Sequence, residues 1–339
     1  MAGLTARICA MLLALASLAS ARADSVSDFY KGRNVDVYVG YSTGGGYDIY
    51  ARMLARHMGR FIPGNPTLVP KNMEGAGSLR LANWLANAGP RDGSVFGTIG
   101  RGTSFDPILG QPGAQFTAGD FSWLGSMNQE VSICAAWHDA GIKSFEDLRT
   151  KELLVGAVSN NDDTGQFARV INTVLGTKLK IVAGYPGGND VVLAMERGEV
   201  KGRCGWSWSS VLTAHMAWWK EKKIVILVQL ALAKHPDLPD VPLVTDLAKS
   251  EAQRQMLRMI FARQVMGRPF LAPPGVPAER VAALRKAFMD TMNDKDFLAD
   301  AEKAKLEINP VDGEKVQALV KEIYATPPEV AKQAAAALK

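Results

Sequence analysis

The chain has 339 residues, 47% of them hydrophobic and 22% charged, which is long enough for two folded lobes rather than one core. Its 39 Lys and Arg residues against 34 Asp and Glu give a formal net charge of +5. The basic residues are dispersed and form no stripe or aromatic-interleaved patch, so the composition argues against a nucleic-acid partner.

Residues 1–23 have the pattern of a secretory signal peptide. Arg7 supplies the positive charge, residues 8–18 form an apolar run, and an A-x-A cleavage site ends at Ala23. The run is too short to span a bilayer, which disfavours the alternative of a retained membrane anchor. We therefore expect a periplasmic protein, cleaved near Ala23, whose mature chain begins at about Asp24.

The most informative segment of the mature chain is residues 35–52, where a buried strand leads through a glycine loop into a helix. Gly44, Gly45 and Gly46 lack Cβ atoms, so a ligand can approach the backbone there. The N-terminus of the helix points unpaired N–H groups and a partial positive charge at this loop. Such an arrangement can hold an anion, although any open α/β sheet can contain one.

Short apolar segments alternate with helical patterns along the rest of the chain. The predicted strands cover residues 35–39, 67–72, 95–100, 132–137, 154–158, 180–183 and 224–230. The predicted helices cover residues 49–61, 78–87, 144–150, 164–175, 189–197 and 277–293, with an alanine-rich surface helix near residues 331–338. This alternation predicts an α/β fold with parallel sheets covered on both faces and a ligand crevice between two lobes.

Common catalytic and metal-binding patterns are missing from the sequence. The four histidines lack metal-ligand spacing, and residues 205–209 depart from the G-x-S-x-G of hydrolases because Ser209 replaces the second glycine. Residues 75–77 resemble part of a dinucleotide fingerprint, but Arg80 replaces its third glycine. We therefore predict no catalytic residue, no metal and no cofactor.

Two cysteines remain in the mature chain, Cys134 and Cys204. In an oxidising periplasm they could form a disulfide, or they could be two buried free thiols. The sequence leaves both possibilities open.

Six motifs in the same order resemble those of the Bug (TctC-like) family, the periplasmic substrate-binding proteins of tripartite tricarboxylate transporters. The first is the glycine loop with Asp48, Ala51 and Arg52, although the family's prolines are absent from it. The matching segments are residues 40–52, 72–78, 90–93, 182–188, 238–242 and 272–277. Each motif is modest, but together they span essentially the whole mature chain.

The resemblance implies the two-lobed fold of type 2 periplasmic binding proteins, with the ligand crevice between the lobes. Residues 24–131 and 228–339 would form lobe 1, and residues 132–227 would form lobe 2. Family members bind small carboxylates through backbone N–H groups and short hydroxyls, without metal or covalent chemistry. The resemblance thus implies a monomeric receptor that captures a small organic carboxylate and delivers it to integral membrane permease subunits.

Carried over position by position, the resemblance places ligand contacts in both lobes. These are Tyr41, Ser42, Thr43, Gly44, Gly45, Gly46, Asp48, Arg101, Gly102, Thr103 and Ser104 in lobe 1, and Asn160, Asn161, Asp162, Thr164, Tyr185, Gly187, Trp206 and Trp208 in lobe 2. We expect Asp48 to organise the loop more than to touch the ligand. Arg101 could pair with a distal carboxylate or be an exposed rim cation, and the two tryptophans could line the site or pack in the lobe core.

Residues 159–166 depart from the Ser/Gly-rich loop of the family. Two carboxylates beside an anion site would repel an anionic ligand. One interpretation makes Asp163 an N-cap with Gln166 at N3 and turns Asp162 to solvent. The other interpretation has Asp162 or Asn161 contact a cationic or hydroxylated part of the ligand.

Two alternative functions remain at this stage. The first is a receptor that signals to a sensor kinase instead of feeding a permease. The second is an exported hydrolase or isomerase, which would need a nucleophile and a base in the crevice. The histidine pattern argues against the second alternative.

Overall fold

The computed structural model describes residues 26–338, so the predicted signal peptide and its cleavage site lie outside the described residues. The strands are β1 (Asn34–Val39), β2 (Thr67–Asn72), β3 (Val95–Thr98), β4 (Ser122–Ser126), β5 (Ser132–Trp137), β6 (Leu153–Ala157), β7 (Leu179–Ala183), β8 (Gly202–Ser207), β9 (Ile224–Leu230), β10 (Pro269–Ala272) and β11 (Val311–Asp312). The helices are α2 (Gly46–Met58), α3 (Leu79–Asn87), α4 (Asp147–Thr150), α5 (Asp163–Leu175), α6 (Gly188–Glu196), α7 (Trp208–Ala214), α8 (Met216–Lys220), α9 (Glu251–Phe261), α10 (Ala278–Met292), α11 (Lys295–Lys303), α12 (Gly313–Tyr324) and α13 (Pro328–Ala337).

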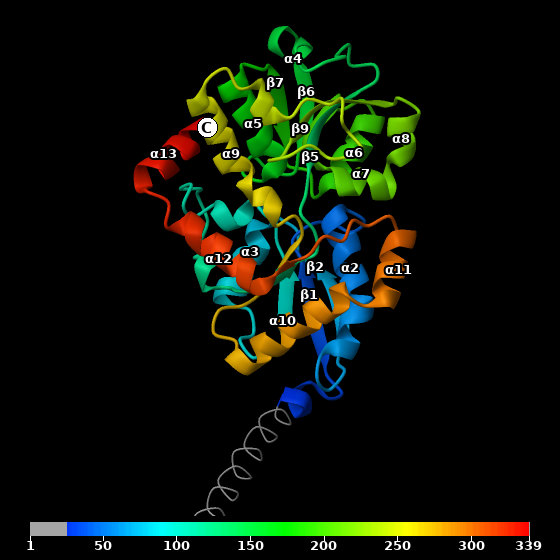
Figure 1. The fold of residues 1–339 in the computed structure, drawn as a ribbon, viewed down its shortest axis with the longest axis vertical. Helices are drawn as coiled ribbons and strands as arrows, with labels where there is room; N and C mark the ends of the chain where they lie inside the picture. The colour runs from blue at the N-terminus through cyan, green and yellow to red at the C-terminus, as the bar shows by residue number, and fades with distance from the viewer. Residues whose placement is uncertain (1–25, 339) are drawn as a thin grey trace, which may run out of the picture.

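The strands form two sheets, one in each lobe of the molecule (Figure 1). The first has the order β11-β4-β10-β3-β1-β2 and the second the order β7-β6-β8-β5-β9. The seven predicted strands are all present, but the prediction of parallel sheets is only partly correct. Strands β1, β2 and β3 are parallel, whereas β10 is antiparallel to β3 and β4, and β5 is antiparallel to β8 and β9. The reversed strands β5 and β10 are the first strands that the chain forms after each of the two crossings between the lobes.

The chain crosses between the lobes later than the sequence indicated. The expected boundary at residue 227 falls inside β9, and this strand pairs with β5 in the second sheet along its whole length. Helix α9 also lies beside the second sheet, where Phe261 packs its ring against Phe167 of α5. The return crossing therefore follows α9 and leads into β10.

The C-terminal helix crosses to the second lobe once more. Helix α12 packs on β4 of the first lobe, but α13 packs on α5 of the second. Arg169 of α5 donates a hydrogen bond to the Leu338 carbonyl, at 3.2 Å. The alanine-rich segment is thus a helix, as predicted, and it adds a third connection between the lobes (Figure 1).

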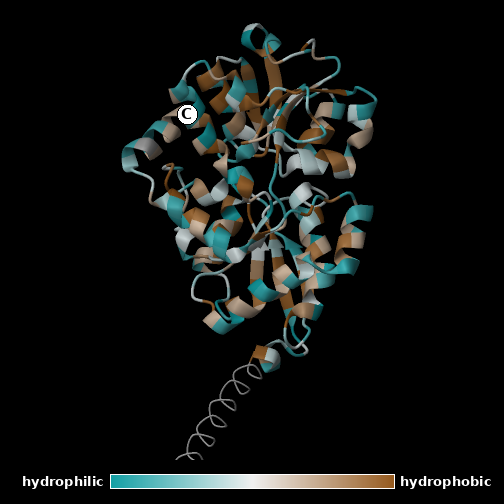
Figure 2. Cartoon of the chain, viewed as in Figure 1, coloured by the Kyte–Doolittle hydropathy of each residue, from teal (hydrophilic) through white to brown (hydrophobic). Residues whose placement is uncertain are grey.

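Hydrophobic residues fill the sheets and the helix faces that cover them (Figure 2). In β1, Val35, Val37 and Val39 are fully buried, which is the period-2 pattern of a strand. One apolar cluster continues across both lobes on the side of α9, α12 and α13, and joins Phe105 and Val320 to Phe261. This side of the molecule therefore holds the lobes together by apolar packing.

Cys134 of β5 and Cys204 of β8 form a disulfide between neighbouring strands, which decides the question that the sequence left open. Within residues 26–338 there is no helix with the length and hydropathy needed to cross a membrane.

Candidate functional site

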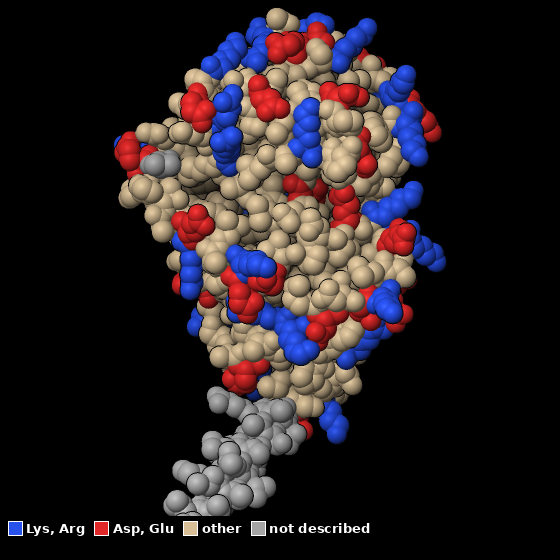
Figure 3. All heavy atoms as spheres, in the orientation of Figure 1, with Lys and Arg blue, Asp and Glu red and all other residues tan. Residues whose placement is uncertain are grey.

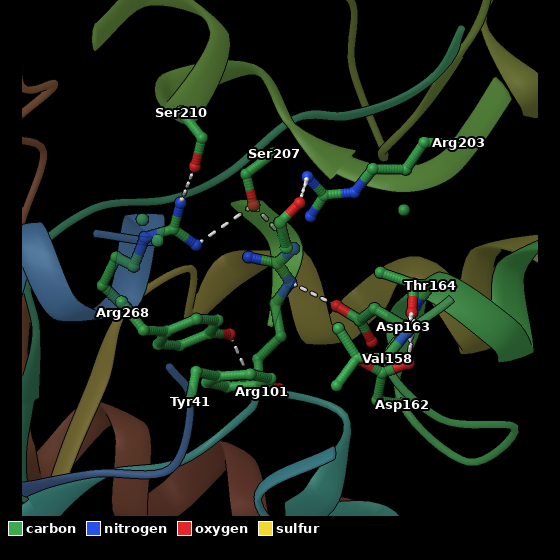
Figure 4. Close-up of a pocket in the computed structure, with 15 residues that line it drawn as sticks. Tyr41, Arg101, Val158, Asp162, Asp163, Thr164, Arg203, Ser207, Ser210 and Arg268 are labelled. Atoms are coloured by element: carbon green, nitrogen blue, oxygen red, sulfur yellow. Dashed lines mark hydrogen bonds and ion pairs between the residues drawn. The ribbon is translucent and has the colours of Figure 1, made fainter. Parts of the chain in front are cut away.

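A small cavity of about 50 Å³ lies between the two lobes (Figure 4). Its walls are Tyr41, Gly45, Gly46, Tyr47, Arg101, Val158, Asp162, Asp163, Thr164, Gly188, Arg203, Gly205, Ser207, Ser210 and Arg268. Six of the ligand-binding residues expected from the sequence are in this lining, namely Tyr41, Gly45, Gly46, Arg101, Asp162 and Thr164.

The glycine loop after β1 forms the wall on the side of lobe 1. Asp48, in the first turn of α2, accepts hydrogen bonds from the backbone N–H of Gly44 (2.9 Å), from Arg52 Nε (2.8 Å) and from Asn72 Nδ2 (2.9 Å). Burial alone would raise the pKa of Asp48, but these hydrogen bonds outweigh it and hold the pKa below its ordinary value. Asp48 therefore fixes the loop and does not line the cavity.

On the opposite wall, Asp162 caps helix α5. Its Oδ1 accepts hydrogen bonds from the backbone N–H groups of Thr164 (3.1 Å) and Gly165 (3.3 Å), and its side chain is buried. The interpretation with Asp163 as the cap and Asp162 in solvent is therefore wrong by one residue. Asp162 has the extended backbone of an N-cap, whereas Asp163 is already helical. Burial is the main cause that raises the pKa of Asp162 to about 6.

Asp163 pairs with an arginine of the facing lobe. Arg101 Nε lies 2.6 Å from Asp163 Oδ2, and Arg263 Nη1 lies 3.3 Å from Asp163 Oδ1. Arg101 also donates to the hydroxyls of Ser132 and Ser207. Arg101 is thus neither an exposed rim cation nor free for a distal carboxylate, because lobe 2 already supplies its carboxylate.

A second buried ion pair lies where the chain crosses between the lobes. Arg268 Nη2 is 3.2 Å from Glu130 Oε2, and the Arg268 guanidinium lies 4.7 Å and 5.0 Å from the ring centroids of Tyr47 and Tyr50. The Ser209 hydroxyl donates a further hydrogen bond to Glu130. We refer to Arg101, Asp163, Arg263, Glu130 and Arg268 as the hinge-side cluster.

Arg203 on β8 differs from these arginines because no acidic group pairs with it. Its side chain is only 8% exposed, and among residues 26–338 no carboxylate forms an ion pair with it and no acceptor bonds its Nε. One guanidinium nitrogen donates to the Gly188 carbonyl at 2.9 Å, and the group lies 5.2 Å from the Trp206 ring centroid. Burial is the main cause that lowers the pKa of Arg203 to about 10. Arg203 therefore brings a buried positive charge that has no ion-pair partner to the cavity wall (Figure 4).

Polar contacts close the lobes at the rim beside α2 and α6. The Ser42 hydroxyl bonds Asn189 Oδ1 (3.0 Å) and Asp190 Oδ2 (2.7 Å), and Asn189 Nδ2 donates to the Thr43 carbonyl (3.0 Å). Ser42 and Thr43 thus connect the lobes at this rim and do not line the cavity.

The other residues expected at the site are outside the lining of this cavity. Trp208 is buried against Trp219, so the lobe-core interpretation holds for it, and the Trp206 ring packs edge-to-face against His215 beside Arg203. Gly102, Thr103, Ser104, Asn161 and Gly187 also lie outside the lining. Gly44 and Trp206 line a smaller neighbouring cavity of about 30 Å³, which shares Gly45, Gly46, Gly188, Arg203 and Ser210 with the first. Asn160 and Tyr185 border a separate surface hollow.

Sequence reasoning missed the residues that give the cavity its charge. Arg203 and Arg268 were not identified, and Asp163 was considered as a helix cap or a carboxylate beside the anion site, not as the partner of Arg101. A usable signal for Arg203 was a lone arginine among the small residues Gly202, Cys204 and Gly205 just before a tryptophan. The segment was not predicted as a strand because it contains glycines, and glycine is depleted in strands.

The charged residues of the outer surface show no comparable organisation. On the face in Figure 3, Lys and Arg alternate with Asp and Glu, and no broad patch of one sign is visible. In the part of the chain that the structure describes, no group of His, Cys, Asp and Glu residues could hold a metal ion.

A scan against protein-family models finds no match for the chain, and a search of the curated proteins also finds none. Among solved structures, the periplasmic binding protein BugD superposes with a TM-score of 0.72 at 20% identity, over 90% of this chain and 98% of that one. MatC from Rhodopseudomonas palustris with bound malate gives 0.70 at 19% identity, over 88% and 99% of the two chains. An R. palustris protein with adipate gives 0.68 at 17% identity, over 89% and 97%.

At these identities the likeness is one of fold. It extends over about nine-tenths of this chain and so covers both lobes. The chain therefore has the two-lobed fold of type 2 periplasmic binding proteins, and the structures of similar fold are Bug and TctC solute-binding proteins.

Proposed function

We propose that this protein is a periplasmic solute-binding receptor of the Bug and TctC type, which captures a small organic carboxylate and delivers it to a membrane permease. The observation that carries the proposal is the buried Arg203 in the interlobe cavity, which has no ion-pair partner and no acceptor for its Nε among the described residues. Burying a cation without a partner is costly, so a site that retains one gains most from an anionic ligand. A carboxylate also matches the planar donor geometry of a guanidinium.

The backbone adds to the attraction for an anion from both sides of the cavity. Helix α2 begins at Gly46 and helix α6 begins at Gly188, and both residues line the cavity. The N-terminus of each helix presents unpaired N–H groups and about half a positive charge. An anion between the two helices would therefore stabilise the closed arrangement of the lobes.

The ligands of the similar structures support this proposal. MatC holds malate, and the R. palustris protein holds adipate, both of them small carboxylates. We propose that the protein binds its ligand without converting it, since the two carboxylates in the cavity lining are already engaged, Asp162 in a helix cap and Asp163 in an ion pair.

Thermal unfolding of the exported protein with a panel of acids tests the proposal. The panel includes mono-, di- and tricarboxylates, with neutral sugars and amines as negative probes. A ligand at about 100 times its Kd stabilises the folded state by about 2.7 kcal/mol. We expect stabilisation by at least one carboxylate, its loss in Arg203→Met, and its retention in Arg197→Met, whose side chain is 69% exposed at the end of α6.

Two results would contradict the proposal. One is stabilisation by sugars or amines but by no acid, and the other is enzymatic turnover of the acid that binds. Delivery to a permease has its own test, because cells without the gene should lose uptake of the bound acid.

A further inference from the structure

We infer that the preferred ligand is a short monocarboxylate with a hydrogen-bond donor on the neighbouring carbon, that is, a small 2-hydroxy or 2-amino acid. This inference rests on the proposed function and specifies its substrate class. It is carried by the size of the cavity, by the single unpaired cation and by the position of Asp162.

The first argument is size. The cavity is small, with a volume of about 50 Å³. Its walls are held by interlobe contacts, namely the ion pair of Arg101 with Asp163 on one side and the Ser42 bonds to α6 on the other. A chain as long as adipate would have to break these contacts, whereas an acid of two or three carbons would not.

The second argument is charge. Four buried arginines lie at or beside the cavity, but Arg101 and Arg263 share Asp163, and Arg268 pairs with Glu130. Arg203 alone has no carboxylate among the described residues. The cavity therefore offers one unpaired guanidinium to a ligand carboxylate, and a second carboxylate would meet the carboxyl of Asp162.

The third argument is the free acceptor on Asp162. Its Oδ1 receives the hydrogen bonds of the helix cap, including one from the Thr164 hydroxyl, while no donor among residues 26–338 bonds its Oδ2. The carboxyl lines the same cavity as Arg203, and its charge is the main factor that opposes the fall in the Arg203 pKa. A hydroxyl or ammonium group next to the ligand carboxylate would complete the hydrogen bonding of Asp162.

Isothermal titration calorimetry at neutral pH tests the inference with matched acids. Glycolate and lactate carry a hydroxyl, glycine and alanine an ammonium group, propionate no donor, and succinate and malate a second carboxylate. We expect the best hydroxy or amino acid to bind at least about tenfold more tightly than propionate, succinate and malate, equal to about 1.4 kcal/mol. The affinities of the hydroxy acids compared with those of the amino acids show which hydrogen-bond donor the site prefers.

The variant Asp162→Asn then tests the role of Asp162, because Asn is an equally good N-cap and keeps α5 intact. The preference for lactate or alanine over propionate should fall to below about threefold. If the Asn variant does not fold, Asp162→Ser is the second variant to test, because Ser is also a favourable N-cap residue. The control is Asp312→Asn, which changes a helix cap of α12 outside the cavity lining and should keep the preference.

The outcomes separate the two proposals. If succinate or malate binds as tightly as lactate and alanine, or if Asp162→Asn keeps the preference, the inference is wrong and the receptor function stands. If no acid of any length binds, both proposals fail.

Discussion

The hinge-side cluster and the wall that carries Arg203 differ in how they balance buried charge. In the cluster, each arginine reaches a carboxylate, and the pair of Arg101 with Asp163 joins the two lobes directly. On the other wall, Arg203 is just as deeply placed but has only a carbonyl and an aromatic ring as neighbours. The comparison indicates that paired charges hold the closed lobes together, whereas the unpaired charge is left for a ligand.

The largest effect on stability is expected from breaking the ion pairs of the hinge-side cluster. Asp163→Asn leaves Arg101 and Arg263 buried without a carboxylate, and removing one partner of a buried ion pair costs about 3–5 kcal/mol. Urea denaturation of the unliganded protein should show this loss in the free energy of unfolding. Asp139→Asn, which breaks an exposed pair with Lys201, should change it little. Equal effects of the two variants would mean that the cluster does not hold the lobes.

The second prediction concerns pH and Asp162. Its folded-state pKa of about 6 lies above its ordinary value of 3.8, so the folded protein holds this proton more tightly than the unfolded chain. The free energy of unfolding should therefore fall by about 3 kcal/mol through this group as pH rises from about 4 to about 6. Denaturation curves across this range should show a shallower fall in Asp162→Asn. An unchanged slope would mean that Asp162 is ionised throughout.

Arg203→Met should separate binding from stability. Replacing an unpaired buried cation by an apolar side chain is often neutral or stabilising, so unfolding of the unliganded protein should need at least as much urea. Carboxylate affinity should fall about 10- to 150-fold, the equivalent of about 1.5–3 kcal/mol for a charge-assisted hydrogen bond. On the same preparation, calorimetry measures the carboxylate affinity and urea denaturation measures the stability of the unliganded protein. A large loss of stability would contradict this prediction and would mean that Arg203 stabilises the folded protein as the arginines of the hinge-side cluster do.

The smallest effect is expected from Gly188→Ala. A Cβ at this position would collide with the Arg203 guanidinium, so the arginine must move within the cavity. We expect affinity to fall by less than about tenfold and the free energy of unfolding to change little, since Ala favours the first turn of α6. Gly119→Ala is a matched control, because nothing lies within 4 Å of its added Cβ. Unchanged affinity would show that the position of Arg203 is not critical.

Much of the fold was accessible from the sequence because its signals are local. The valines of β1, the glycine loop and the apolar face of α2 lie in one continuous segment, and β2, β5 and β9 were predicted to the residue. Strand β8 was missed because Gly202 and Gly205 interrupt its pattern.

The candidate site was less accessible because its chemistry depends on distant partners. Asp163 is 62 residues from Arg101 in the chain, and no spacing rule joins an acid and a base over that distance. Considered separately, Asp163 suggested a helix cap and Arg101 suggested a rim cation. The absence of a partner for Arg203 is a property of the folded structure that no sequence window contains.

The third connection between the lobes has a consequence for how solute enters. The two crossings and the α12–α13 link lie with the shared apolar cluster along one edge, while the α2 and α6 rim is joined only by polar contacts that water can replace. Two lobes that are joined along one edge can rotate about that edge but cannot separate there. We therefore expect the lobes to open on the side away from this edge, and the Ser42 contacts to α6 are among those that must break for solute to enter.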